Sequence, residues 1–323
     1  MNDNSSLPRV VVLAGGISHE RDVSLRSGRL IADSLASQGV SVELRDPDAT
    51  LFGYLEETRP DVVWPALHGA SGEDGSLRSL LDLAGIPYIG ARGAAARLAW
   101  DKPTAKALVA AAGIATPQSL ALSRDTFRDL GAANVLQQIA ANILGPLAVK
   151  PAQGGSAQGV ALVDDPGEDL AGAMVNAYRY WDVAVVERFI AGTEISVCVI
   201  DSGGGPVALP AVEIVPRSGV YSFEARYNAG ETRFYTPARI SADAAATAAN
   251  AAVSVHRAIG LRHLSRIDFI LDSAGVPWFL EASVMPGLTE TSLFPEALEA
   301  AGHDVGWLFL ALCQAAVADQ IAV

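Results

Sequence analysis

Short β-branched runs alternate with stretches of helical apolar spacing along the first hundred residues. The predicted elements are three strands at residues 9–13, 41–45 and 61–67, helices at 23–38 and 77–84, and a further strand at 86–90. This alternation favours a parallel sheet with helices on both faces. Because such sheets bind ligands at the carboxyl ends of their strands, residues 15–20 and 68–74 are the loops where a site is expected.

Strand hairpins and longer helices follow in the rest of the chain. Helices are predicted at 101–112 and 241–260, and strands at 147–150, 160–163, 182–189, 194–200, 266–271 and 277–281. Ser241 has the position of a helix N-cap, and residues 202–206 (SGGGP) form a turn signal. The apolar segment 305–323 is interrupted by Gln314, Asp319 and Gln320, which predicts a buried C-terminal helix and no membrane span. Domain boundaries are expected near residues 95 and 187.

Composition indicates a well-buried globular protein. The chain has 323 residues, of which 50% are hydrophobic and 18% charged. The net charge of 23 − 36 = −13 gives no sign of a nucleic acid or an anionic membrane as partner. The N-terminus lacks a basic segment followed by an apolar core, so we expect no signal peptide and a cytoplasmic location. Cys198 and Cys313 lie in apolar surroundings and are expected to be buried thiols.

Lysine is rare in this chain. The 23 basic residues include only Lys102, Lys106 and Lys150, and the other 20 are arginines. In such a background each lysine raises the question of whether an ammonium group is specifically required, with chance as the alternative.

Lys150 stands at the end of a predicted strand, directly before a glycine-rich segment, VKPAQGGSAQG. Backbone N–H groups of such a loop can cradle phosphate oxygens while the ammonium supplies charge. The segment is not a P-loop, since no Gly-Lys-Ser/Thr follows, and no GxGxxG occurs in the chain. An ordinary glycine-rich turn beside an exposed lysine is the alternative.

Two further segments carry candidate chemistry. Asp268 and Glu281 lie on the arms of a predicted hairpin, where two carboxylates could hold Mg²⁺ together with nucleotide phosphates. Arg266 falls on the same strand face as Asp268, although a surface ion pair would explain this pattern as well. In VERFIAGTE, Glu187 and Glu194 flank apolar residues that suit an adenine slot, but alone this segment favours an ordinary strand end.

Taken together, the motifs of the whole chain resemble those of one protein family. The segments AGGISHERDVSLRSG, LHGASGEDGSLRSLLDLAGIPYIG, DK at 101–102, VKP with its glycine loop, YSFEARY, RIDFIL and EASVMPGLTETSL occur in order. They resemble the signatures of the D-alanine–D-alanine ligase family over nearly the full length. The resemblance implies a three-domain α/β ATP-grasp fold: an N-terminal parallel-sheet substrate domain (1–95), a central subdomain with the glycine-rich loop (96–186), and a C-terminal subdomain with the metal site and lid (187–323).

The resemblance also implies roles for single residues at the nucleotide. Lys102 and Lys150 match the lysines that hold ATP phosphates, and Arg226 stands where many members have a lysine near the γ-phosphate. The adenine and ribose positions correspond to Glu187, the backbone near Phe189 and Ile190, and Glu194. The expected metal ligands, for two Mg²⁺ ions or Mn²⁺ in their place, are Asp268, Glu281 and Ser283.

At the amino-acid substrates the resemblance assigns a second set. Glu20 matches the residue that binds the ammonium of the first D-alanine, with Ser156 and Tyr227 closing over the substrates in a hydrogen-bonded triad. Arg266 and the Gly287 N–H match an oxyanion site. The remaining matches are His68 beside the first substrate, and Ser292 and Leu293 at the carboxylate of the second.

The implied reaction joins two D-alanines through an acyl phosphate, with residues 220–233 as a lid and a homodimer as the expected assembly. Two residues depart from the family pattern: Arg226 replaces lysine, and Ser283 replaces the asparagine that usually binds the second Mg²⁺. The shorter serine predicts weaker binding of that metal ion. An ATP-grasp ligase for another amino acid or dipeptide remains the alternative within the fold, and a non-catalytic nucleotide-binding relative the alternative outside enzymes.

Overall fold

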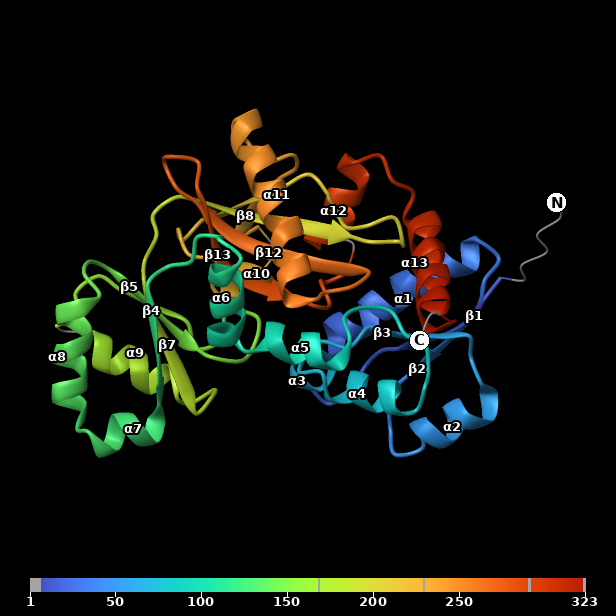
Figure 1. The fold of residues 1–323 in the computed structure, drawn as a ribbon, viewed down its shortest axis with the longest axis horizontal. Helices are drawn as coiled ribbons and strands as arrows, with labels where there is room; N and C mark the ends of the chain where they lie inside the picture. Colours follow the sequence, from blue (N-terminus) through green and yellow to red (C-terminus); the bar gives the residue numbers. More distant parts are fainter. Residues whose placement is uncertain (1–6, 168, 229, 290–291, 322–323) are drawn as a thin grey trace.

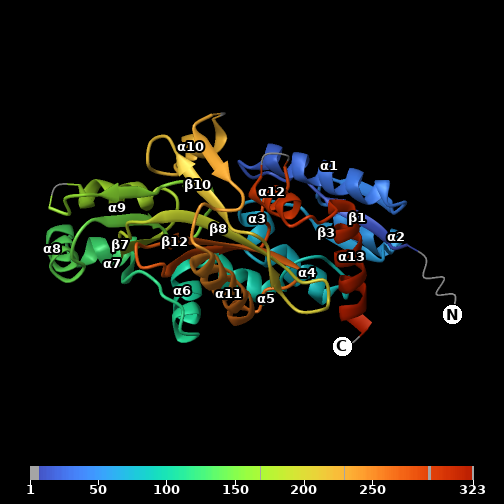
Figure 2. The same ribbon diagram turned by 90° about the horizontal axis from the view of Figure 1, so that it is seen from above.

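We describe the protein from a computed structural model, in which residues 7–167, 169–228, 230–289 and 292–321 are described. Three sheets follow one another along the long axis, with the N-terminal sheet at one end and the sheet of residues 119–188 at the other (Figure 1). The remaining sheet, called the middle sheet below, lies between them, and the sheet of residues 119–188 is called the third sheet. Strand β10 (Val212–Pro216) of this middle sheet and helix α10 (Phe223–Tyr227) lie at the top of Figure 2.

The N-terminal sheet is parallel, as the alternating pattern predicted. Its order is β2-β1-β3, with β1 at Arg9–Leu13, β2 at Ser41–Arg45 and β3 at Val62–Pro65. The accompanying helices are α1 (Arg21–Ser37), α2 (Leu51–Thr58), α3 (Ala70–Glu73) and α4 (Ser76–Leu83). The valines of β1 are buried on both faces of the sheet, which explains its continuous apolar run.

The strand expected at residues 86–90 does not form. Only an isolated parallel bridge joins Tyr88 to Val63. Pro87 has no N–H to donate to a ladder, and Gly90 leaves the extended region at φ +97°. This segment therefore contributes one bridge to the sheet edge and then turns toward the C-terminal part of the chain.

The middle sheet is antiparallel and has the order β11-β10-β8-β12-β13, with β9 paired to β8. Its other strands are β8 (Thr193–Ile200), β9 (Val207–Ala208), β11 (Thr232–Tyr235), β12 (Leu264–Leu271) and β13 (Pro277–Ser283). Helices α5 (Gly93–Trp100), α6 (Lys102–Ala111) and α11 (Ala242–Ile259) pack against it. The Ser241 hydroxyl caps α11 by accepting the Ala244 N–H at 3.2 Å, as predicted.

The third sheet belongs to a subdomain with its own core. Its order is β4-β7-β5-β6, at Ser119–Ser123, Val183–Arg188, Leu147–Pro151 and Ala161–Val163. It packs against α8 (Ala132–Asn142) and α9 (Leu170–Ala177), with α7 (Arg124–Asp129) beside β4. The buried hydrophobic cluster here is drawn entirely from residues 135–186.

The N-terminal and C-terminal parts of the chain share one core. Helices α12 (Leu293–Ala300) and α13 (Val305–Ile321) bring C-terminal residues against the parallel sheet, where Trp64 and Phe309 meet edge to face with ring centroids 4.8 Å apart. The Gly90 N–H also donates to His263 Nδ1 at 2.9 Å. Cys198 and Cys313 are buried free thiols in this core, as expected.

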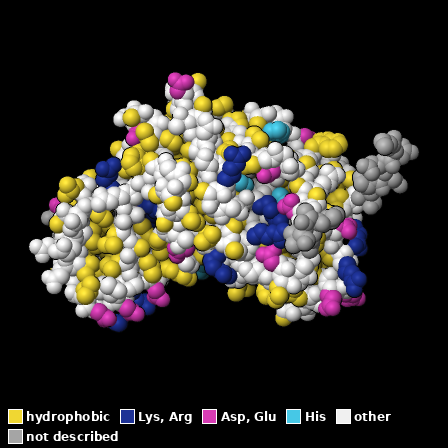
Figure 3. Space-filling model, in the orientation of Figure 1, with side chains coloured by type: hydrophobic (Ala, Val, Ile, Leu, Met, Phe, Trp, Pro, Cys, Tyr) yellow, Lys and Arg dark blue, Asp and Glu magenta, His cyan; other side chains and the backbone are white. Residues whose placement is uncertain are grey.

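No single helix in the described part of the chain is long and apolar enough to cross a membrane. The bent pair Leu293–Ala300 and Val305–Asp319, which meet at 106°, passes the same length and composition test. On the face shown in Figure 3, hydrophobic side chains gather over the subdomain of the third sheet, and Lys and Arg side chains lie in separate small groups.

Candidate active site

Three cavities with shared walls open where the three sheets face one another. We name them the cleft cavity (about 430 Å³), the inner cavity (about 140 Å³) and the outer cavity (about 610 Å³). Every site residue expected from the sequence lines at least one of them, except Tyr227, whose side chain lies outside the described part of the structure. Arg226 lines all three cavities. The sequence motifs therefore converge on one place.

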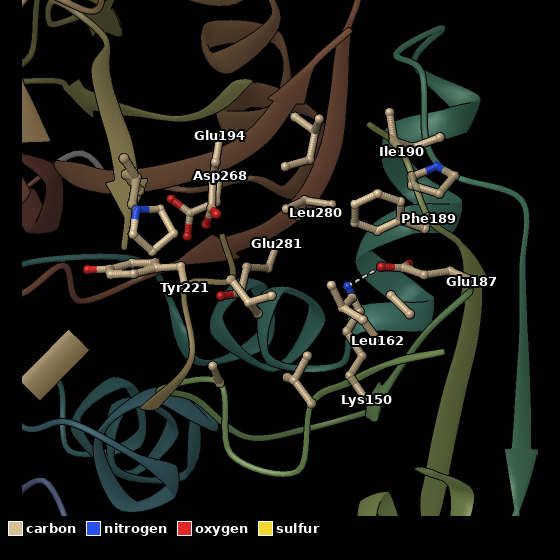
Figure 4. A pocket seen from close by; sticks show the side chains of 18 of the residues that line it. Lys150, Leu162, Glu187, Phe189, Ile190, Glu194, Tyr221, Asp268, Leu280 and Glu281 are labelled. Carbon is tan, nitrogen blue, oxygen red and sulfur yellow. Dashed lines mark ion pairs between the residues drawn. The ribbon is translucent and has the colours of Figure 1, made fainter. Parts of the chain in front are cut away.

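The cleft cavity lies between the middle sheet and the third sheet. Phe189 and Ile190, which follow β7, form an apolar wall on one side, and Glu194 of β8 lies across from them (Figure 4). Burial raises the pKa of Glu194 to about 7, with Asp268 and Glu281 acting in the same direction. The cavity thus combines a flat apolar wall with oxygen acceptors, a suitable lining for a base and a sugar.

All three lysines of the chain converge beside this cavity. Lys150 Nζ lies 2.5 Å from Glu187 Oε1, and Lys106 Nζ lies 2.5 Å from Glu187 Oε2 (Figure 4 shows the first pair). Lys102 Nζ donates to the Gly154 carbonyl at 2.7 Å. Burial would raise the pKa of Glu187, but Lys150 and Lys106 outweigh it and hold that pKa below its usual range. The carboxylate of Glu187 is therefore a buried anion between two ammonium groups.

The β12–β13 hairpin brings the two candidate metal-binding carboxylates face to face. Asp268 and Glu281 are direct cross-strand partners, as their positions on the predicted hairpin suggested. Arg266 holds Asp268 in a two-point contact, through Nε at 2.9 Å and Nη2 at 2.8 Å, and Ser196 donates a hydrogen bond to the same carboxylate. Burial would raise the pKa of Glu281, but Lys102, together with other nearby cations, lowers it to about 2.

This donor set fits Mg²⁺ only in the presence of a further ligand. Within the described residues, no group of three or more His, Cys, Asp and Glu side chains could hold a metal ion. Mg²⁺ is commonly bound by one or two carboxylates together with substrate phosphates, and Asp268 and Glu281 provide the two. The third expected ligand, Ser283, lies opposite Arg266 and directs its hydroxyl to Glu73 at 3.3 Å.

The inner cavity gathers acidic groups at the carboxyl end of the parallel sheet. Glu20, just before α1, accepts a hydrogen bond from Ser156 of the glycine-rich loop. Burial, with Glu20 nearby, raises the pKa of Glu73 to about 7. His68 is buried and lies 3.2 Å from the Ser27 hydroxyl, and burial, assisted by Arg266, lowers its pKa to about 4. The histidine is therefore neutral at pH 7.

The outer cavity is formed by the segment after β13 and the lid. A side chain at Gly287 would place its Cβ 2.8 Å from the Ser292 hydroxyl, so a larger residue here would displace that hydroxyl. Ser292 in turn accepts the Thr289 N–H at 3.0 Å. Leu293, the first residue of α12, completes this wall.

The expected lid, residues 220–233, contains helix α10 and the start of β11. The Arg226 guanidinium lies over the ring of Tyr221, 4.0 Å from its centroid. Arg226 Nε is buried and has no hydrogen-bond partner among the described residues. A cation is thus held by an aromatic face at the point where the three cavities meet.

Four residues at this site were not identified from the sequence as functional. Glu73 lies inside the GEDG motif and Lys106 is one of only three lysines, so both carried a signal that could have been followed. Tyr221 opens the YSFEARY segment. Ser196 gave no signal, because its contact with Asp268 depends on the β8–β12 register.

Comparisons with known proteins agree with this geometry. Sequence profiles described as "D-ala D-ala ligase C-terminus" and "D-ala D-ala ligase N-terminus" match residues 108–314 and 50–91. A D-alanine–D-alanine ligase of Anaeromyxobacter sp. (strain Fw109-5) is 41% identical over 95% of this chain and 94% of its own, and one of Gloeobacter violaceus is 40% identical over 92% and 95%.

Solved structures share the whole fold. The VanG D-Ala:D-Ser ligase of Enterococcus faecalis superposes with a TM-score of 0.82 at 25% identity, covering 96% of this chain and all of that one. The Bacillus anthracis D-alanine–D-alanine ligase complexed with ATP gives a TM-score of 0.80 at 24% identity, covering 98% and 99%. With the matched profiles and relatives spanning most of its length, the chain belongs to the D-alanine–D-alanine ligase family and has the ATP-grasp fold.

Proposed function

We propose that the protein is an ATP-dependent carbon–nitrogen ligase that joins two D-alanines, forming ADP and phosphate, and supplies D-alanyl-D-alanine for peptidoglycan precursors. The observation that carries this proposal is Arg226, which lines all three cavities. A reaction between a nucleotide and two amino acids needs all three held next to one another, and a cation at their junction can stabilise charge on the transferred phosphoryl group. We assign the nucleotide to the cleft cavity, the first D-alanine to the inner cavity and the second to the outer cavity.

ATP would occupy the cleft cavity with its adenine against Phe189 and Ile190 and its ribose at Glu194. Lys102 and Lys150 would contact the phosphates. Glu187 contributes to the adenine end while remaining ionised between its lysine partners.

Asp268 and Glu281 would hold two Mg²⁺ ions, or Mn²⁺, together with the ATP phosphates. Such ions would neutralise charge on the triphosphate. Ser283 would serve the second ion weakly, because its hydroxyl already contacts Glu73.

In the first step the carboxylate of the first D-alanine attacks the γ-phosphate, giving an acyl phosphate and ADP. Glu20 receives the substrate ammonium, and the Ser156–Glu20 hydrogen bond closes the glycine-rich loop over the inner cavity. His68 lies beside the substrate as a neutral group. Phosphoryl transfer depends mainly on positioning and charge stabilisation, which Lys102 and Arg226 supply.

In the second step the amine of the second D-alanine attacks the carbonyl carbon of the acyl phosphate. The peptide bond forms, the carbon–oxygen bond to the phosphate breaks, and inorganic phosphate and the amine proton are released. Arg266 and the Gly287 N–H stabilise the oxyanion, and Ser292 and Leu293 receive the carboxylate of the acceptor. Tyr227 closes the site as part of the lid. Water must be excluded because an acyl phosphate hydrolyses, and α10 with the glycine-rich loop provides the cover.

This proposal places the enzyme in the cytoplasm, where ATP and free D-alanine are available, and makes small molecules its partners.

We also propose a homodimer, which light scattering of the purified protein would test. The domain assignment 1–95, 96–186 and 187–323 is likewise proposed, and limited proteolysis with and without nucleotide would test it.

The decisive experiment measures ADP release with D-Ala, L-Ala, D-Ser and D-lactate in turn, and with D-Ser added to D-Ala, and identifies the products by mass spectrometry. We expect release with D-Ala alone, D-alanyl-D-alanine as the product, and almost none from the Lys150→Met variant. Absence of release with every D-amino acid would refute the proposal. A mixed product appearing only when D-Ser accompanies D-Ala would instead identify a D-serine acceptor.

A further inference from the structure

Lys106 occupies a position in the site that the proposed reaction does not use. It lies on helix α6 four residues after Lys102, so both ammonium groups leave the same helix face. Lys102 lines the cleft cavity, whereas Lys106 does not and reaches the far oxygen of Glu187 instead. Both Lys106 and Glu187 are almost fully buried, at 4% and 2% exposure.

The register of the third sheet places Lys150 on the other side of the same carboxylate. Ala148 is the cross-strand partner of Glu187, and Lys150, two residues further along β5, lies on the same sheet face. Lys150 lines the cleft cavity, in contrast to Lys106. Glu187 therefore has one counter-ion toward the nucleotide side and one behind it.

The two counter-ions differ in what else they can contact. Lys150 can turn from Glu187 toward phosphate oxygens in the cavity, whereas Lys106 is confined behind the carboxylate. A buried carboxylate that loses its only cation becomes an uncompensated charge, which is strongly unfavourable. With Lys106 present, Glu187 keeps one counter-ion when Lys150 leaves.

We propose that Lys106 is a positioning residue for nucleotide binding: it remains as the counter-ion of Glu187 and thereby frees Lys150 to bind phosphate. This inference rests on the proposed placement of ATP in the cleft cavity. It gives a role to the lysine at each oxygen of one buried carboxylate, in a chain that has only one other lysine.

The proposed role of Lys106 predicts different effects on the affinity for ligands with phosphates and for ligands without them. In Lys106→Met, Glu187 would retain Lys150 as its sole partner, and phosphate would compete with Glu187 for that ammonium. Affinity for ADP should fall by about ten- to a hundredfold, while affinity for adenosine should change by less than about threefold. If Lys106 only supported packing, its replacement would weaken the binding of ADP and of adenosine equally.

The test is calorimetric titration of the folded full-length protein with ADP in the presence of Mg²⁺, and separately with adenosine. The variants are Lys106→Met, Lys106→Arg, Glu187→Gln and the Lys106→Met/Glu187→Gln double substitution. Lys106→Arg keeps the charge and should retain ADP affinity within about tenfold of wild type. The double variant should bind ADP within about threefold of Glu187→Gln alone, because a neutral residue 187 no longer retains Lys150.

Equal loss of ADP and adenosine binding in Lys106→Met, unchanged ADP binding, or simple additivity in the double variant would each overturn the inference. Unchanged ADP binding in Lys106→Met with normal dipeptide synthesis by the wild type would refute the role of Lys106 alone. Wild type that binds ADP but forms no dipeptide would refute the proposed ligase activity and leave the role of Lys106 measurable.

Discussion

The Ser283 hydroxyl donates a hydrogen bond to the Glu73 carboxylate at 3.3 Å, which links the last residue of β13 to the last residue of α3. The family resemblance of the sequence implies a metal-binding asparagine at the position of Ser283. In this chain the Ser283 side chain is instead engaged with Glu73, a partly buried acid beside the N-terminal sheet. The contact therefore joins an expected ligand of the metal site to an acid that lines the inner cavity.

Replacing Ser283 by asparagine should lower the Mg²⁺ concentration that gives half-maximal activity. An amide oxygen reaches further and is a better ligand for a hard cation than a hydroxyl engaged with Glu73. We expect a decrease of about tenfold, equivalent to ~1.4 kcal/mol. Mg²⁺ titrations of ADP release at saturating substrates measure it.

Ser283→Ala is the matched control, because it removes the hydroxyl without adding a ligand. Its Mg²⁺ requirement should stay within about threefold of wild type, because the serine is proposed to serve the second ion only weakly. A requirement in Ser283→Asn that is unchanged or higher would show that the serine does not limit metal binding.

Removing the aromatic ring beneath Arg226 should weaken the binding of ATP and of the second D-alanine, which are both proposed to contact this cation. The Arg226 guanidinium lies 4.0 Å from the ring centroid of Tyr221, and cation–π contacts contribute ~0.5–2 kcal/mol. In Tyr221→Leu the KM values for ATP and the second D-alanine should rise by about three- to tenfold. Tyr221→Phe keeps the ring and should stay within about twofold. Equal kinetics for the leucine and phenylalanine variants would argue against the stacking role.

The hydrogen bond from Ser156 to Glu20 joins the glycine-rich loop to the start of α1. Hydrogen bonds to charged groups contribute ~1.5–3 kcal/mol, so Ser156→Ala should raise the KM of the first D-alanine by about ten- to a hundredfold. Initial rates at varied D-alanine measure this effect. Ser202→Ala, in the exposed 202–206 turn, serves as control and should behave as wild type.

Buried neutral histidines should make the protein less stable in mild acid. Burial lowers the pKa of His256 to about 4 and that of His263 to about 3, from 6.5 in an exposed side chain. Between these values the unfolded chain binds more protons than the native one, so stability rises with pH and is lost as pH falls below about 6.5. Each histidine contributes a slope of up to ~1.4 kcal/mol per pH unit in this window.

Urea unfolding of wild type and His256→Gln at pH 6 and pH 5 tests this linkage. The free energy of unfolding should decrease less in the variant, by about 1 kcal/mol over that interval. An identical decrease in both proteins would mean that His256 is already protonated in the native state.

Much of the fold was predictable where the sequence pattern is strong. The parallel N-terminal sheet, the alanine-rich helix with its Ser241 cap, and the β12–β13 hairpin all follow from periodicity and local capping signals. The prediction of a strand at 86–90 was wrong, because Pro87 and Gly90 limit this segment to a single bridge. Helices α7 and α8 were missed, because their many polar and alanine positions give only a weak apolar pattern.

The candidate site was predictable as a set of residues, but its contacts were not. Ordered motifs identified Lys150, Glu187 and Asp268, and the structure brings them to one cleft. The bridging of Glu187 by two lysines and the two-point contact of Arg266 with Asp268 depend on helix placement and strand register. Such long-range pairing leaves no local trace in the sequence.

Because residues 135–186 have a separate core, the cleft cavity and the outer cavity depend differently on the position of that subdomain. The residues lining the outer cavity come only from segments 23–26 and 221–296, which lie outside that core. The cleft cavity, by contrast, is lined from both sides, by β5 and β7 and by β12 and β13. A movement of the subdomain that carries Lys150 would therefore change one wall of the cleft cavity and none of the outer cavity.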